Sequence, residues 1–196
     1  MRLASIIINI AIFLTTLVML LRCFREGAEW QLERGLKCLR YFTVLSNVFC
    51  AVAALFMAIA QLRGGVPYVV FMLKYVGTVA VTVTLATVFL FLGPSLGSYK
   101  TLLEGDNLYL HLIGPLLALL SFCLLEKRPM TFASTLWGMM PVLLYGAVYL
   151  FQVALAPEDR RWEDFYGFHR RRPSALTYAG VTLGAYMICV LLWIAC

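Results

Sequence analysis

Long uninterrupted apolar runs dominate the chain, and the short segments between them carry most of the charge. Each run reaches the roughly 18 residues that a helix needs to cross the hydrocarbon core of a bilayer. The runs are continuous rather than alternating, and they are longer than barrel strands, so they predict helices. The predicted helices cover residues 3–24, 41–62, 68–93, 106–125, 130–156 and 173–196.

Two details of these helices follow from single residues. A third helix that begins near Tyr68 includes Lys74, which either snorkels to the membrane surface or faces the bundle interior. The Gly93-Pro94-Ser95 segment is expected to end that helix. In the fourth helix, Pro115 removes a backbone hydrogen bond to the carbonyl of His111 and is expected to open the helix there. The predicted fold is all-α, a single six-transmembrane-helix bundle over residues 1–196.

Composition agrees with a polytopic membrane protein. The chain is 62% hydrophobic and 13% charged, with a mean hydropathy of +0.87, whereas water-soluble domains carry about 25% charged residues. We interpret the first helix as a retained span rather than a removed signal peptide. The net charge of +6 does not indicate nucleic-acid binding, because positive charge in short loops sets membrane topology.

The basic residues are unevenly divided between the two sides of the predicted bundle. Eleven of the sixteen Lys and Arg residues fall in the first, third and fifth loops. The positive-inside rule therefore predicts that these loops are cytoplasmic and that both termini are extracytoplasmic. The runs at 158–161 and 170–172 are expected to contact anionic lipid headgroups or to attract an anionic lipid substrate.

One face of the second helix carries three polar side chains just inside the membrane. Thr43, Ser46 and Asn47 stand at positions i, i+3 and i+4, and so share that face. Lipid offers them no hydrogen-bond partner, so the face must turn to protein or to a wet cavity. The alternatives to a binding site are that Thr43 bonds back to its own helix and that Ser46 and Asn47 join helices.

His111 is the only histidine inside an apolar run. A neutral imidazole can take a proton from a hydroxyl and return it, and Asn107, one turn earlier, is positioned to fix its tautomer. The alternative is an interfacial histidine bonded to a neighbour. The second and fourth helices start on the same side, which places Thr43 and His111 within a few ångströms in depth. We therefore expect the two side chains to meet in a shared cavity.

Other polar residues allow two interpretations. The third helix carries Thr78, Thr82, Thr84 and Thr87. Thr78 and Thr82 share a face and either line a cavity or satisfy backbone groups. Asp106 either lies in a solvated loop or orients a catalytic group. The fifth loop is expected to cover the mouth of a cavity with Trp162, Asp164, Tyr166 and His169.

No metal or cofactor is expected. The two histidines are far apart, and HExxH, GxSxG, P-loop and GxGxxG motifs are absent from the sequence. The six cysteines form no CxxC pair, and a disulfide is not expected, with Cys23–Cys38 the one pair considered. Gly180 and Gly184 form a GxxxG pair, which packs the last helix either within the chain or against a second copy.

Four short motifs together resemble the androgen-induced and androgen-dependent membrane hydrolase superfamily, in particular its bacterial six-helix members. Two are Phe42-Thr43-x-x-Ser46-Asn47 after a basic loop and His111-x-x-x-Pro115. The others are Tyr145 with Tyr149, and the run Trp162-x-Asp164-Phe165-Tyr166-Gly167-Phe168. The resemblance implies a membrane-embedded hydrolase of fatty acid esters of hydroxy fatty acids, with Thr43 as nucleophile and His111 as general base.

Under this hypothesis, Ser46, Asn47 or Asn107 would donate a hydrogen bond to the oxyanion. The residues expected to bind or position the substrate are Thr78, Thr82 and Tyr145. Relatives carry Asp-Trp after the histidine motif, whereas this chain has Ser121-Phe122. The resemblance therefore does not identify an acid that would orient His111. The alternative function is a non-enzymatic bundle that binds or transports a lipid, a small solute or a proton. A third is a scaffold that binds a partner or a second copy through Gly180 and Gly184.

Overall fold

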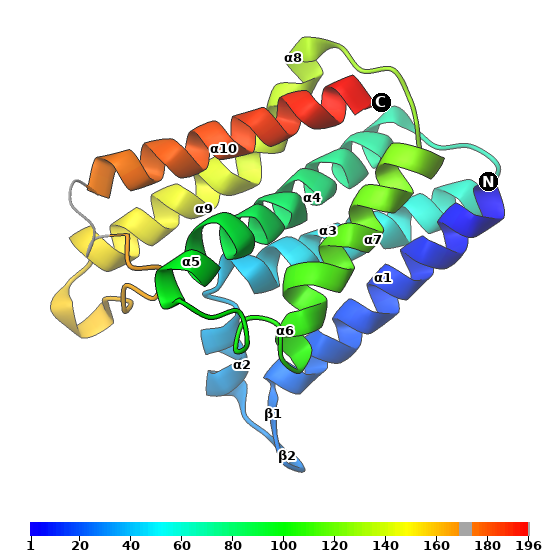
Figure 1. Ribbon diagram of the computed structural model, residues 1–196. Helices are drawn as coiled ribbons and strands as arrows, with labels where there is room; N and C mark the ends of the chain where they lie inside the picture. Colours follow the sequence, from blue (N-terminus) through cyan, green and yellow to red (C-terminus); the bar gives the residue numbers. More distant parts are fainter. Residues whose placement is uncertain (169–173, 196) are drawn as a thin grey trace.

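The computed structural model describes residues 1–168 and 174–195, except for the side chain of Ser174. This part of the chain contains six helical segments that are long and apolar enough to cross a membrane. They are Arg2–Cys23, Phe42–Leu62, Tyr68–Leu96, Asp106–Leu125, Phe132–Leu155 and Ala175–Ala195. The prediction of an all-α, six-helix, multi-pass membrane protein is confirmed. Figure 1 shows both ends of the chain at the same end of the bundle.

The first two spanning segments, α1 (Arg2–Cys23) and α3 (Phe42–Leu62), are continuous α-helices. The third is built from α4 (Tyr68–Thr87), the π-helix η1 (Val88–Leu92) and α5 (Gly93–Leu96). The fourth comprises α6 (Asp106–Leu108), the π-helix η2 (Tyr109–Ile113), α7 (Gly114–Leu120) and the π-helix η3 (Ser121–Leu125).

The fifth spanning segment comprises α8 (Phe132–Thr135), the 3-10 helix η4 (Leu136–Met139), α9 (Met140–Leu150) and the π-helix η5 (Phe151–Leu155). The fifth loop contains a short 3-10 helix, η6 (Glu158–Arg160). The last spanning segment is α10 (Ser174–Ala195).

Two of the π-helical turns lie directly before a proline. η1 precedes Pro94 and η2 precedes Pro115, and a proline can neither donate to the α-helical ladder nor fit beside the carbonyl four residues earlier. The predicted opening of the fourth helix at His111 is therefore confirmed. The prediction that Gly93-Pro94-Ser95 ends the third helix is wrong. Pro94 is accommodated in the first turn of α5, and the helix ends at Leu96, where Gly97 adopts a φ of 64°.

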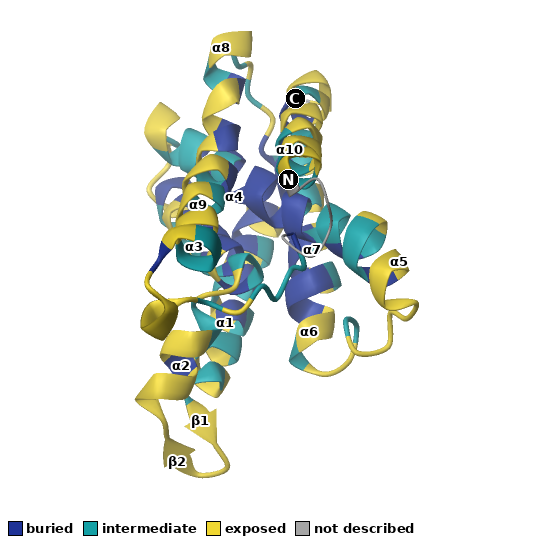
Figure 2. Cartoon of the chain, turned by 90° about the vertical axis from the view of Figure 1, so that its left-hand side faces the viewer, coloured by how far each residue is buried: buried dark blue, intermediate teal, exposed yellow. Residues whose placement is uncertain are grey.

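Helices α3 and α4 are largely buried, and α4 lies at the centre of the bundle, whereas α9 and α10 expose one face each (Figure 2). Tyr75 and Val79 of α4 pack against Phe122 in the largest buried cluster. Gly77 lets α3 and α4 approach closely, because a Cβ there would lie 2.9 Å from the Cα of Cys50. The exposed faces of α9 and α10 carry large apolar side chains such as Leu144 and Leu183, as lipid contact requires.

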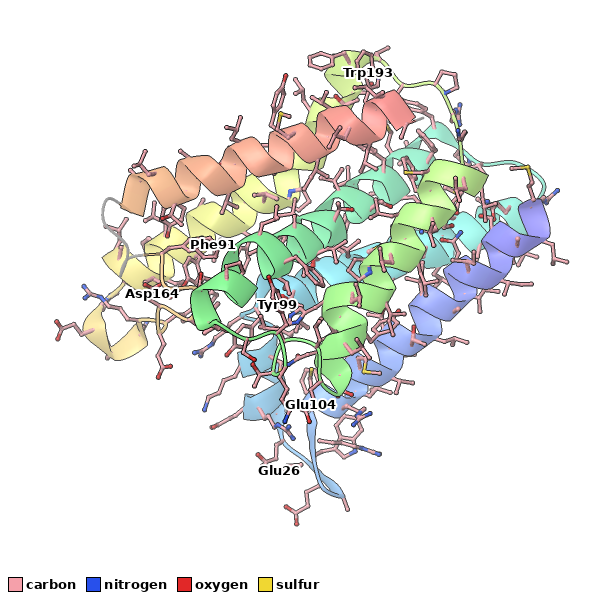
Figure 3. All side chains as sticks on the ribbon, viewed as in Figure 1. Glu26, Phe91, Tyr99, Glu104, Asp164 and Trp193 are labelled. Carbon is pink, nitrogen blue, oxygen red and sulfur yellow. The ribbon has the colours of Figure 1, made fainter. Side chains whose placement is uncertain are left out.

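The first loop has a structure that the apolar pattern did not predict. A short hairpin, β1 (Arg25–Glu26) paired with β2 (Glu29–Trp30), is followed by α2 (Leu32–Cys38). The hairpin projects from the bundle, with Glu26 near its tip (Figure 3). Cys23 and Cys38 are in hydrogen-bonding contact, and both thiols are free.

Candidate functional site

Thr43 lies in the wall of a pocket at the bundle end that carries the basic loops. The cavity has a volume of about 70 Å³ and lies between α3, α4, η1, α9, α10 and the fifth loop. Most of its described wall is apolar or aromatic, and the described residues contribute hydroxyl groups from several elements and no charged side chain. The residues that contribute hydroxyls are Thr43, Thr84, Thr87, Thr182, Tyr145, Tyr149, Tyr166 and Tyr178.

The first turn of α3 is held by a residue from the fifth loop. Tyr166 Oη accepts a hydrogen bond of 2.9 Å from the Phe42 N–H, and the Thr43 N–H lies near the same oxygen. No side chain of α3 itself caps this helix start, so the phenol satisfies donors that would otherwise be unpaired. Burial raises the pKa of Tyr166 to about 12, although the two N–H donors act in the opposite direction.

Two further tyrosines attach the fifth loop and α9 to the pocket wall. Tyr145 Oη donates to the Arg40 carbonyl at 2.7 Å, and Tyr149 Oη donates to Asp164 Oδ1 at 2.8 Å. Asp164 also accepts from the Phe168 N–H at 3.0 Å, and it lies at the bundle end where α5 ends, not far from Phe91 (Figure 3). The fifth loop thus forms part of the pocket, as predicted for Tyr166. His169 lies outside the described residues.

The remaining polar residues of the α3 face act as links between helices. Ser46 Oγ lies 2.9 Å from Thr84 Oγ1 on α4. Asn47 Nδ2 donates both to the Thr43 carbonyl at 2.8 Å and to the Leu110 carbonyl at 3.0 Å. Among the described residues, no group forms a hydrogen bond with Thr43 Oγ1. Thr43 therefore does not bond back to its own helix and presents an unpaired hydroxyl.

His111 takes a different direction from the one predicted. Its ring is 7% exposed, and Nδ1 lies 2.6 Å from the Leu102 carbonyl oxygen. This geometry requires Nδ1 to carry the proton, which leaves Nε2 as the basic nitrogen. His111 is not among the residues that line the Thr43 pocket.

The neighbours proposed for His111 have other partners. Asn107 Nδ2 donates to the Thr101 carbonyl at 3.0 Å, so the prediction that Asn107 fixes the tautomer is wrong. The Leu102 carbonyl has that role, because the chain before α6 folds back over the ring. Asp106 forms a 3.0 Å ion pair with Arg22 and does not orient a catalytic group here.

The structure brings together the backbones of Thr43 and His111 but not their side chains. The Asn47 amide spans from Thr43 to Leu110, the residue next to His111. From there the threonine side chain turns toward the pocket and the imidazole toward Leu102. Counting residues from the start of each helix gave the depth of Thr43 and His111 correctly. The π-helical turn at 109–113 changes the direction of side chains in the fourth segment.

The threonines of α4 divide into two groups. Thr78 Oγ1 donates to the Lys74 carbonyl at 2.9 Å and Thr82 Oγ1 to the Thr78 carbonyl at 2.7 Å, so both satisfy backbone groups and neither lines the pocket. Thr84 and Thr87 line it instead. Their depth in the membrane could have identified Thr84 and Thr87 from the sequence, because α4 runs antiparallel to α3 and its last turns lie level with Thr43.

A lipid-facing groove adjoins the pocket. It has a volume of about 500 Å³ between α10 and the α4–η1 segment, and it shares Val83, Thr87 and Val181 with the pocket. Gly180 and Gly184 lie in its wall, and a Cβ on either glycine would meet nothing within 4 Å. The GxxxG pair therefore packs against no other described part of the chain.

A second polar cluster, at the bundle end that holds the N-terminus, was not predicted. Lys74 is 0% exposed. Of the two positions predicted for it, it therefore faces the bundle interior and does not snorkel to the membrane surface. Its Nζ donates to Asn9 Oδ1 at 2.7 Å, and the Asn9 amide donates to Glu126. Neither Asn9 nor Glu126 stood out in sequence, since a single Asn in α1 and a Glu at a helix end are common.

The described residues contain no group of three or more His, Cys, Asp or Glu side chains able to hold a metal ion. The chain matches no family model, and no curated protein or solved structure is significantly similar to it. The function must therefore be argued from the pocket itself.

Proposed function

We propose that this chain is a membrane-embedded hydrolase that cleaves carboxylic esters in lipid-like substrates, with Thr43 as nucleophile and His111 as general base. Fatty acid esters of hydroxy fatty acids are the substrate class that the resemblance implies. The observation that carries the proposal is the unpaired Thr43 hydroxyl in an apolar pocket that adjoins a lipid-facing groove. An ester linkage would sit at Thr43 while its acyl chain lies in the groove.

The reaction follows the general scheme for an activated hydroxyl. Thr43 Oγ1 attacks the ester carbonyl as its proton passes to His111 Nε2, and the imidazolium then protonates the leaving alcohol. Water, activated by the same imidazole, releases the acid from the acyl-threonine. Ser46 and Asn47 are engaged with other groups. Thr87 and Thr182 line the pocket and become the preferred oxyanion donors.

This scheme requires the His111 ring to turn from Leu102 toward Thr43 when substrate binds. The Asn47 bridge supports the proposal, because it keeps the two backbones adjacent. A substrate that displaces the segment around Leu102 would free the His111 ring to form a hydrogen bond with Thr43.

One observation favours a second candidate, a bundle that binds or transports a lipid without cleaving it. His111 lies outside the lining of the Thr43 pocket, and a binding protein needs no base there. In both candidates the lipid enters from the bilayer, and the positive-inside rule predicts that the basic loops are cytoplasmic.

Ester hydrolysis by the purified protein in lipid nanodiscs tests the proposal. We expect the wild type to release free fatty acid, detected by mass spectrometry, and Thr43→Val to release none above background. Thr82→Val is the matched control, since its hydroxyl bonds to the Thr78 carbonyl outside the pocket, and it should retain activity. Saturable lipid binding without hydrolysis by the wild type, weakened by Gly146→Leu in the pocket wall, would establish the binding candidate instead.

A further inference from the structure

Six polar side chains from four spanning segments meet within the bundle at the end that holds the N-terminus. Each is less than one-tenth exposed, and none lines the Thr43 pocket. We call this group the Glu126 cluster; its members are Ser5, Asn9, Gln61, Lys74, Ser121 and Glu126. Ionisable residues inside a membrane bundle are costly and usually mark a function.

Hydrogen bonds connect the two charged members through Asn9. Glu126 Oε1 accepts from Ser5 Oγ and Ser121 Oγ, both at 2.7 Å, and from Asn9 Nδ2. The other end of the Asn9 amide accepts from Lys74 Nζ at 2.7 Å. A single carboxylate oxygen thus receives three donors.

Two oxygens in the same cluster have no partner. Glu126 Oε2 and Gln61 Oε1 are buried, and no described residue donates a hydrogen bond to either. The two side chains are neighbours, because Gln61 Nε2 and Glu126 Oε1 both bond to Ser5 Oγ, at 2.9 and 2.7 Å. Buried polar atoms are nearly always hydrogen-bonded. Since both orphaned atoms are acceptors, what the cluster lacks is a hydrogen.

We propose that Glu126 is a reversible proton-binding site inside the bundle, with the proton on Oε2 donated to Gln61 Oε1. One proton would satisfy both orphaned oxygens. Its uptake converts the carboxylate to a carboxylic acid and removes the negative charge that balances Lys74. These two effects oppose each other, which allows both protonation states. The proton comes from water at this end of the bundle, where Glu126 follows the last turn of the fourth spanning segment.

The surroundings of Glu126 favour a proton over a small cation. Lys74 already places a positive charge beside the cluster, and two vacant oxygens are too few for a metal ion, which takes about six. Among the described residues, the Cys50 thiol of α3 is a further titratable group that interacts with both Lys74 and Glu126. Of the basic residues that follow Glu126, Arg128 turns to the Val66 carbonyl and the rings of Tyr68 and Phe71, and Lys127 lies near Cys123.

Infrared difference spectroscopy of the protein in lipid nanodiscs tests the proposal without any substrate. We expect a carboxylic-acid carbonyl band that appears as the pH is lowered and is absent in Glu126→Gln. Glu104→Gln is the matched control, because Glu104 is an exposed residue of the third loop, at the opposite end of the bundle from Trp193 (Figure 3). That variant should keep the band. No Glu126-dependent band, or a band that responds to sodium and not to pH, would overturn the proposal.

Two variants that retain Glu126 keep the test valid if Glu126→Gln fails to fold. Lys74→Met removes the balancing positive charge and should move the midpoint of the band upward by about one pH unit or more. Gln61→Met removes the oxygen that accepts a hydrogen bond from protonated Glu126, and should move the midpoint of the band to lower pH. An unchanged midpoint in both variants would contradict the proposed proton site, whether or not Thr43 is a nucleophile.

Discussion

The two ends of the bundle hold their polar groups in opposite ways. At the end with the basic loops, the described residues surround an open pocket with hydroxyl groups and contribute no charged side chain to it, and none of them bonds to the Thr43 hydroxyl. At the other end, Lys74 and Glu126 are buried and connected through Asn9, and two oxygens are left without donors.

The difference follows from the cost of burying each kind of group. An unpaired hydroxyl costs a few kcal/mol at most, whereas an isolated buried charge costs far more unless it is paired or neutralised. A membrane protein can therefore leave a hydroxyl open to a ligand but must enclose a lysine and a glutamate in a network. The Thr43 pocket is suited to chemistry on a ligand, and the Glu126 cluster to joining helices and holding a proton.

The largest expected effect is on the stability of the charged end. Asn9→Leu removes the only link between Lys74 and Glu126 that the structure shows, and should lower the free energy of unfolding by about 3–5 kcal/mol. Reversible unfolding in mixed detergent micelles measures the change. Thr84→Val is the comparison at the pocket end, where loss of the bond to Ser46 should cost about 1 kcal/mol. Equal losses of stability in the two variants would show that the charged network at one end is no more costly to break than the hydroxyl bond at the other.

A smaller effect is expected where the pocket meets the bilayer. Gly180→Leu places a side chain in the open groove and should slow cleavage of a long-chain ester about tenfold, while a short-chain ester is cleaved at the normal rate. If instead the variant changes the native mass of the protein in nanodiscs, Gly180 belongs to an interface with a second copy, as the GxxxG pair also allows.

The smallest expected effect concerns the start of α3. Tyr166→Phe removes the oxygen that accepts from the first turn and should cost about 1 kcal/mol of stability. Tyr68→Phe, which loses a bond between exposed groups, should change stability by less than about 0.5 kcal/mol.

The loss in Tyr166→Phe should also depend on pH. The folded state favours the neutral phenol, since burial raises the pKa of Tyr166 to about 12. Its contribution is therefore complete below about pH 10, the value expected for an unfolded chain. It is lost as the pH rises through 12. A difference between wild type and variant that grows above pH 10 would show that Tyr166 is not the capping group.

Much of the fold was predictable because lipid imposes a simple rule on sequence. A spanning helix must be long and apolar, and the six predicted helices differ from the observed segments by a few residues at their ends. The hairpin and α2 of the first loop were missed, since the loop between α1 and α3 (residues 24–41) has no comparable periodicity. The third helix continued through Pro94 because a π-helical turn absorbed the missing hydrogen bond.

The candidate site was predictable in depth but not in direction. Counting residues placed Thr43 and His111 at one end of the bundle. Tyr145 was named by the resemblance, and Thr43 and Tyr145 do line one pocket. The direction of His111 depends on the π-helical turn and on the loop carbonyl of Leu102, neither of which a helical wheel contains. Asn9 and Glu126 are 117 residues apart, so only the packing of the fourth segment on α1 reveals their contact.

Site-resolved labelling with a fluorophosphonate probe tests whether Thr43 is a nucleophile activated by His111. The probe reacts with an activated hydroxyl, and mass spectrometry identifies the modified residue. If Thr43 and His111 act as a pair, the wild type is labelled at Thr43, His111→Ala loses the label, and Asn107→Ala keeps it. Absence of labelling at Thr43, or labelling that persists in His111→Ala, would contradict the proposed hydrolase.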